Sequence, residues 1–185
     1  TGITFPTGGG STFLAVYAVP VQVGDIFNYV SFIAAVAGGT LTHSWVAVYN
    51  GVATGAALLG QVADNTTSTG WATGAQKLTF AASIANIGTI GTPQGGGSAA
   101  VTPNSPAMWG IAIYQVGTTL NKFDGAPGGT QAALALTGQT APLVNQVPMV
   151  SVSSAGVTAT ATAPAVLPTM AAAAGGVPYL VLSRQ

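Results

Sequence analysis

The sequence predicts an all-β protein: an antiparallel β-sandwich, jelly-roll-like in form, with an extended C-terminal segment rich in Pro, Ala and Thr. Only 3% of the 185 residues are charged and none is Glu, whereas a usual soluble domain has about 25% charged residues. A water-exposed helix needs such residues on its outer face, so helical bundles are excluded. In addition, glycine clusters separate stretches rich in Val, Ile, Phe, Tyr, Trp and Thr, which is typical of strands joined by turns.

Eight such stretches are predicted to be strands: residues 12–19, 28–36, 41–49, 58–63, 76–81, 108–116, 147–153 and 179–182. Most of them follow a glycine cluster or a glycine-containing turn, at residues 8–10, 24–25, 38–39, 95–97, 128–129 and 175–176. The strands at 58–63 and 76–81 flank a polar loop at residues 64–71. Eight short strands with such turns suit two packed sheets.

Alternation along two of these strands predicts which faces are buried. In residues 28–36 the predicted core face carries Val30, Phe32, Ala34 and Val36, and the other face is half polar. In residues 108–116 both faces are largely apolar: Trp109, Ile111 and Ile113 alternate with Gly110, Ala112 and Tyr114. We therefore expect this strand to be covered on both sides, which requires a neighbour beyond the second sheet.

The composition changes near Gly125, and this predicts two parts, a sandwich domain at residues 1–124 and a C-terminal segment at residues 125–185. No charged residue occurs in the second part before Arg184, and it holds six of the eleven prolines. Because proline cannot donate to a strand ladder, we expect edge strands or extended arms there. The segment either completes the sandwich or forms an arm that contacts other subunits. The Ala/Thr run at residues 157–164 suits a strand of small side chains or a linker.

The composition also excludes classes of function. Three scattered bases cannot displace counterions from phosphates, so nucleic acid is not an expected partner. No run of 18 apolar residues is uninterrupted, so no membrane insertion is expected, and the first ten residues do not match a signal peptide. Without cysteine there is no disulfide framework and no thiolate metal site.

No enzyme motif is found, and we expect no catalytic residue, cofactor or metal site. Nucleotide-binding glycine motifs are missing, and the three aspartates are far apart in the chain. A serine triad would need His43, the one histidine, but its neighbour Ser44 points to the opposite face of the strand at 41–49. The hydrolase hypothesis therefore rests on His43 alone, and a hydrogen-bonded strand histidine near Trp45 is the expected role. Asp25 and Asp124 stand beside glycines, as expected in turns.

One candidate ligand site remains in the polar loop at residues 64–71. Trp71 follows Asp64, Asn65 and several hydroxyl residues, and an aromatic ring beside such groups suits a glycan. These three residues are the candidate glycan contacts. The alternative is that Trp71 packs beneath its own sandwich edge, whereas Trp45 and Trp109, in the middle of apolar strands, are expected in the core or an interface.

A set of strand and turn residues between positions 12 and 124 resembles a known family. They are Val23-Gly24-Asp25-Ile26, Phe32-Ile33, Ala37 to Leu41, Trp45 to Asn50, Leu58 to Asp64, Gly70-Trp71 and Gln76-Lys77-Leu78. This order is similar to that of β-sandwich domains on surface proteins of tailed bacteriophages that infect actinobacteria, especially minor tail, fibre and capsid decoration proteins. The glycine-rich insert near residues 95–106 and the last sixty residues depart from that pattern.

The resemblance implies a non-enzymatic structural protein on the surface of a virion, either a tail adhesin or a capsid decoration protein. Its implied partners are other virion proteins and a host envelope glycan. The sparse charge adds copies of the chain itself, as a homo-oligomer and most simply a homotrimer. A nearly uncharged surface agrees with this, because it protects a free monomer poorly against self-association. The alternative hypothesis is a carbohydrate-binding module of a secreted or cell-surface protein.

Overall fold

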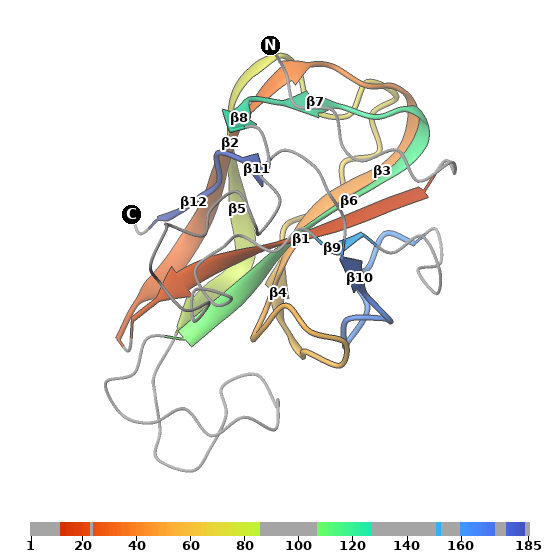
Figure 1. The fold of residues 1–185 in the computed structure, drawn as a ribbon. Coiled ribbons are helices and arrows are strands. Elements are labelled where there is room, and N and C mark those ends of the chain that lie inside the picture. The colour runs from red at the N-terminus through yellow and green to blue at the C-terminus, as the bar shows by residue number, and fades with distance from the viewer. Residues whose placement is uncertain are drawn as a thin grey trace, which may run out of the picture.

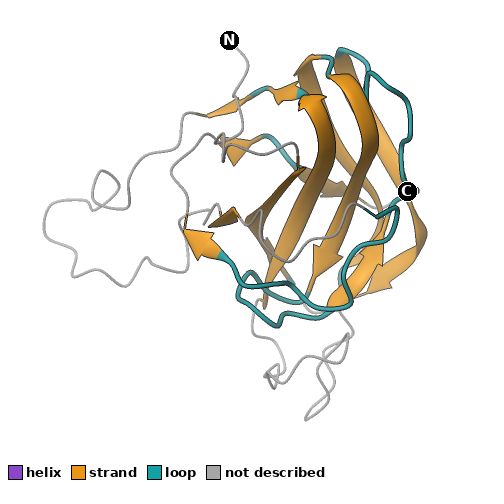
Figure 2. Ribbon diagram, turned by 90° about the vertical axis from the view of Figure 1, so that its right-hand side faces the viewer, coloured by secondary structure: helices purple, strands orange, loops and turns teal. Residues whose placement is uncertain are grey.

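A computed structural model describes residues 12–22, 24–85, 107–126, 151–152, 160–172 and 177–183. Within these ranges every regular element is a strand and no helix occurs (Figures 1 and 2). The main strands form two antiparallel sheets, as in a β-sandwich, so the predicted all-β class is confirmed. No helix in the described residues has the length and apolar character needed to cross a membrane.

The first sheet has six strands, and its long central strands come from distant parts of the chain. Its order is β10 (Ala171–Ala172), β9 (Ser151–Val152), β1 (Thr12–Val21), β6 (Ala107–Thr119), β3 (Gly39–Tyr49) and β4 (Leu58–Gln61). β6 lies between β1 and β3, pairing Tyr114 with Leu14 on one side and with Trp45 on the other. We call this sheet 1.

The second sheet, sheet 2, is built on one long strand. Its order is β12 (Val181–Ser183), β2 (Ile26–Val36) and β5 (Gly74–Ala85), and β7 (Lys122–Phe123) also pairs with β2. A separate pair joins β8 (Gly125–Ala126) to β11 (Val177–Pro178). An antiparallel bridge between Val62 and Phe80 links the ends of the two sheets on the β4 and β5 side.

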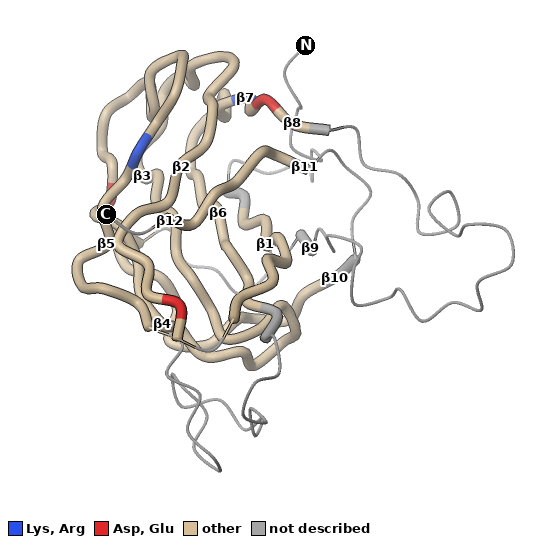
Figure 3. The backbone as a smooth tube through the Cα atoms, turned by 90° about the vertical axis from the view of Figure 1, so that its left-hand side faces the viewer, with Lys and Arg blue, Asp and Glu red and all other residues tan. Residues whose placement is uncertain are grey.

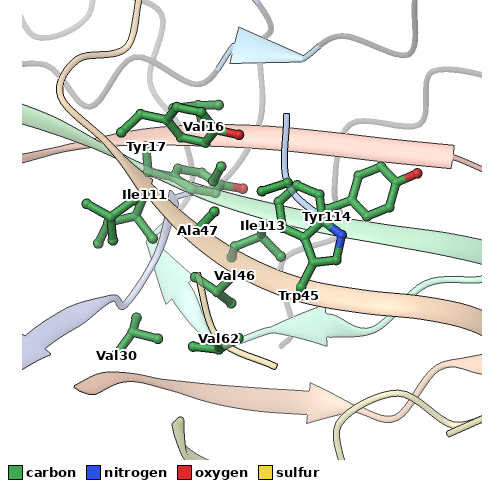
Figure 4. Packing of buried hydrophobic residues seen from close by; sticks show 14 of the residues in the cluster. Val16, Tyr17, Val30, Trp45, Val46, Ala47, Val62, Ile111, Ile113 and Tyr114 are labelled. Carbon is green, nitrogen blue, oxygen red and sulfur yellow. The ribbon is translucent and has the colours of Figure 1, made fainter. Parts of the chain in front are cut away.

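The hydrophobic core lies between the sheets. Phe27 of β2 packs edge-on against Trp109 of β6, with ring centroids 5.9 Å apart. Val30 and Phe32 of β2 are also buried, and Figure 4 shows Val30 facing the side chains of sheet 1. The alternation predicted for β2 is therefore confirmed through Ala34. It is wrong at Val36, which is 48% exposed, because the pairing of β2 with β7 shifts register between Ala34 and Val36.

Sheet 1 is buried on its outer face as well. Trp45 and Tyr114 point to that side and stack with centroids 4.5 Å apart (Figure 4). Residues 160–170, which we call the strap, lie against this face, since the Trp45 indole and the Tyr49 hydroxyl donate hydrogen bonds to carbonyls of the strap. The prediction that both faces of the strand at 108–116 are covered is thus confirmed from Trp109 to Gln115.

The described parts of the predicted C-terminal segment add to both sheets. β9 pairs with β1 of sheet 1, and β12 pairs with β2 of sheet 2. The predicted strand at 147–153 is described only at Ser151 and Val152, and residues 157–159 of the Ala/Thr run lie outside the described residues. The division of the chain at residue 124 stays a prediction from composition.

Candidate functional site

The functional side chains considered from the sequence gather near one end of sheet 1, where β3 places neighbours on opposite faces. His43 lies on the outer face, while Ser44 is fully buried on the side of sheet 2. The two residues pair with Val116 and Gln115 of β6. Their opposite orientation agrees with the strand geometry and keeps the Ser44 hydroxyl away from the imidazole.

His43 is bonded to an aspartate from the loop after β4. Its Nδ1 lies 2.5 Å from Oδ2 of Asp64, whose side chain is only 8% exposed. The other carboxylate oxygen, Oδ1, accepts the backbone N–H of Ser44 at 3.0 Å. Because Asn65 also donates its N–H to the Ser44 carbonyl, the loop is fixed along β3 and Asp64 cannot easily turn away. The predicted role of His43 as a hydrogen-bonded strand histidine is confirmed.

Asn65 shapes the loop in which it stands. Its Oδ1 accepts the N–H and the hydroxyl of Thr67, and its Nδ2 donates to the Gly70 carbonyl at 2.7 Å. Gly70 has a positive φ of 61°, a conformation that favours glycine. The amide of Asn65 is thus already bonded within the loop, as expected of an asparagine that holds a turn.

Trp71 is buried beneath the edge of the sandwich. It is 3% exposed and packs edge-on against Phe32 at 5.0 Å and Phe123 at 6.0 Å. Its backbone N–H donates to Oδ1 of Asn121. Since stacking on a sugar needs an exposed ring face, Trp71 is not available for this contact in the structure. Trp71 thus packs beneath its own sandwich edge, which was the alternative to a glycan contact. Trp71, Asp64 and Asn65 therefore do not present an exposed aromatic ring beside polar groups.

A buried polar cluster, not foreseen as a unit from the sequence, lies beside Trp71. Gln115 donates through Nε2 to Asn121 at 2.6 Å and more weakly to the Ser44 hydroxyl at 3.4 Å. Asn121 in turn donates to the carbonyls of Trp71 and Val36. In the sequence, this cluster could have been expected only from Gln115, a polar residue on an otherwise apolar strand face. Nothing in the sequence identified Asn121 as its partner.

The chemistry available to the His43–Asp64 pair is limited. A histidine oriented by a buried carboxylate is part of the arrangement that activates a serine nucleophile. Among the described residues, however, no hydroxyl is hydrogen-bonded to Nε2 of His43, and Ser44 is held by Gln115 on the opposite face. The described residues also contain no group of three His, Asp or Glu that could bind a metal.

The other two aspartates take part in hydrogen bonds with main-chain groups at turns and strand ends. Asp25 accepts the N–H of Gln22 at 2.8 Å and closes a turn before β2, as predicted. Asp124 lies between β2 and the segment before β12: its N–H donates to Ile33 and its carbonyl accepts from Tyr179. Neither contributes to the surroundings of His43.

Three tyrosines near sheet 1 are held in the neutral form. Burial raises the pKa of Tyr17 and of Tyr49 well above the ordinary value. Burial also raises the pKa of Tyr114, a hydrogen bond to the Thr160 backbone lowers it, and the charge of Asp64 raises it further. These phenols therefore act as neutral hydrogen-bonding groups at neutral pH.

Comparison of the chain with protein-family models, with curated proteins and with solved structures finds no match in any of the three. Functional inference thus rests on the residues themselves and their arrangement.

Proposed function

We propose that the chain is a non-enzymatic structural protein of a bacteriophage, exposed on the virion surface as a minor tail or fibre adhesin or as a capsid decoration protein. In this proposal the sandwich is jelly-roll-like and assembles as a homo-oligomer, with a trimer as the simplest form. The observation that carries the proposal is the combination of an all-β fold with almost no charge. Only five charged residues lie in the described ranges: Asp25, Asp64 and Lys77 stand alone, and Lys122 lies close to Asp124 (Figure 3).

The outer face of sheet 2 supports assembly into a larger body. Ile33, Val181 and Tyr179 are large apolar residues on or beside this face, and Tyr179 is 58% exposed. Lys77 of β5 places its ammonium 3.9 Å from the centre of the Tyr29 ring, in a cation–π contact. Large exposed apolar groups with little charge around them are typical of surfaces that contact other proteins.

The alternative, a carbohydrate-binding module, is less well supported. It was motivated by Trp71 as an exposed ring in a polar loop, and that ring is buried against Phe32 and Phe123. A glycan contact of an assembled adhesin would have to use other residues.

Labelling of whole particles tests the proposed function. Gold-conjugated antibodies against the purified chain would be applied to tailed phage particles produced by an actinobacterial host that carries the gene. We expect label on the particle, at the tail for an adhesin or over the capsid for a decoration protein. Unlabelled particles, with the protein recovered free from the same lysate, would overturn the proposal.

A further inference from the structure

The strap is bound to sheet 1 through its own main chain. The Trp45 indole donates to the Thr160 carbonyl at 3.0 Å, and the Tyr49 hydroxyl donates to the Pro164 carbonyl at 2.9 Å. These two aromatic residues are buried and lie on the same face of β3. Because both donate only to main-chain carbonyls, these bonds do not depend on the side chains of the strap.

β4 and the residues before it also contact the strap through its main chain. Gln61 donates to the Ala161 carbonyl at 3.2 Å and accepts the Ala163 N–H at 2.7 Å. Nearby, Leu58 N–H donates to Ala165 and Leu167 N–H donates to Ala56. The contact is therefore a single antiparallel bridge with its neighbouring main-chain bonds, anchored by the buried side chains of Ala163 and Leu167.

All these partners are distant in sequence from the strap. The hydrogen bonds to Trp45, Tyr49 and Gln61 span 100 residues or more. β9 and β12, which flank the strap in the chain, likewise pair with β1 and β2 of the preceding part. The described residues from 151 to 183, which we call the C-terminal unit, are joined to residues 12–126, the body, through residues 127–150. An identical copy could therefore supply the same unit with the same contacts.

We infer that in the assembled protein the C-terminal unit of one copy docks on the body of a neighbouring copy, with the strap lying across the neighbour's Trp45 and Tyr49. This inference rests on the proposed function, because a particle keeps copies close together. Docking within one chain is favoured because the two parts are tethered, which can give an effective concentration of up to about the millimolar range. Exchange conserves the contacts described above, so neighbours at comparable density make it a low-cost route to a stable oligomer.

The experiment uses the antiparallel bridge between Ala57 and Val166. The flanking hydrogen bonds, from Leu58 to Ala165 and from Leu167 to Ala56, make this a non-hydrogen-bonded pair, whose side chains are close enough for a disulfide. The chain has no natural cysteine. Full-length A57C and V166C would be co-refolded at high concentration, oxidised with oxidised glutathione and separated on a non-reducing gel.

A second pair of cysteine variants tests the same exchange at another place, in case the first pair fails to fold. A third pair is the matched control. S31C with V181C tests the same exchange between β2 and β12 on the outer face of sheet 2. I33C with A75C joins β2 to β5, both within the body, and cannot be linked by exchange of the C-terminal unit. Each single variant alone controls for chance contacts between like cysteines.

We expect covalent dimers, at twice the 18.0 kDa of one chain, in the A57C/V166C and S31C/V181C mixtures and not in the control mixture. The inference is overturned if light scattering shows an oligomer while both test mixtures stay uncrosslinked and the double variant A57C/V166C closes its disulfide within one chain. The proposed function would survive that result. A protein that is monomeric at every concentration would overturn both.

Discussion

Gln115 and Asn121 hold each other through two hydrogen bonds in the interior. Gln115 donates through Nε2 to Asn121 Oδ1 at 2.6 Å, and the Asn121 N–H donates to Gln115 Oε1 at 3.0 Å. Their exposed fractions are 0% and 1%. The pair fixes the turn between β6 and β7 and, through Asn121, the end of the polar loop at Trp71.

Replacement of Asn121 is expected to destabilise the fold strongly. Asn121→Ala leaves the Gln115 amide and the Trp71 and Val36 carbonyls without their partner, and each unsatisfied buried group costs about 1–3 kcal/mol. We expect a loss of roughly 2–4 kcal/mol in the free energy of unfolding, measured by urea denaturation. Gln76→Ala is the control, because its amide makes one exposed bond to Ala72 and should cost less than about 1 kcal/mol. Equal losses in both variants would contradict the role given to Asn121.

Trp71→Ala distinguishes a buried ring from a binding platform. Removal of a buried aromatic side chain leaves a cavity, and we expect a loss of about 3–5 kcal/mol in thermal or urea unfolding. Val36→Ala, which shortens an exposed apolar side chain outside the proposed assembly face, should change stability by about 0.5 kcal/mol at most. A stable Trp71→Ala protein would mean that the ring does not pack against Phe32 and Phe123.

The His43–Asp64 pair is expected to show energetic coupling. A double-mutant cycle of His43→Ala and Asp64→Ala should give an interaction energy of about 0.5–3 kcal/mol, as for other hydrogen-bonded neighbours. Asp64→Ala alone should cost more than His43→Ala, because Asp64 also accepts the Ser44 N–H. Additive effects of the two substitutions would show that the contact contributes nothing to stability.

Alkaline pH is expected to destabilise the protein through its buried tyrosines. Burial raises the pKa of Tyr17, Tyr49 and Tyr114 in the folded state. Above about pH 10 an unfolded tyrosine loses its proton while the folded one keeps it. The unfolded state then binds fewer protons, so the free energy of unfolding falls as pH rises and is fully retained below pH 10.

The measurement is urea unfolding at several pH values between 8 and about 11.5. Tyr17→Phe removes one of the three groups and should make the decline shallower. A free energy of unfolding that stays constant across this range would contradict the burial of these hydroxyl groups.

The long strands could be predicted from sequence because glycine clusters and alternating side chains mark them clearly. The predicted strand at 41–49 lies within β3 (Gly39–Tyr49), and that at 108–116 within β6 (Ala107–Thr119). β1 continues through Pro20, beyond the predicted end at residue 19. Proline is tolerated there because Pro20 pairs only with β6 among the described residues and leaves its other edge without a ladder partner. Two-residue strands such as β7 and β8 were missed, since so short a stretch has no periodicity.

The candidate site was harder to predict because its contacts depend on tertiary structure. The sequence correctly placed His43 and Ser44 on opposite faces of one strand, since that follows from local geometry. It did not predict the bond between His43 and Asp64, which lie 21 residues apart. For Trp71 the polar residues around it suggested exposure, whereas Phe32, Phe123 and Asn121, all far away in the chain, determine its burial.

The most direct test of a charge-poor sandwich built for assembly is the mass of the full chain in solution, measured by multi-angle light scattering over a wide concentration range. We predict a defined oligomer, with a mass three times the 18.0 kDa chain in the simplest case, that persists in high salt because charge contributes little to its contacts. A stable monomer at every concentration would contradict assembly as the reason for this composition.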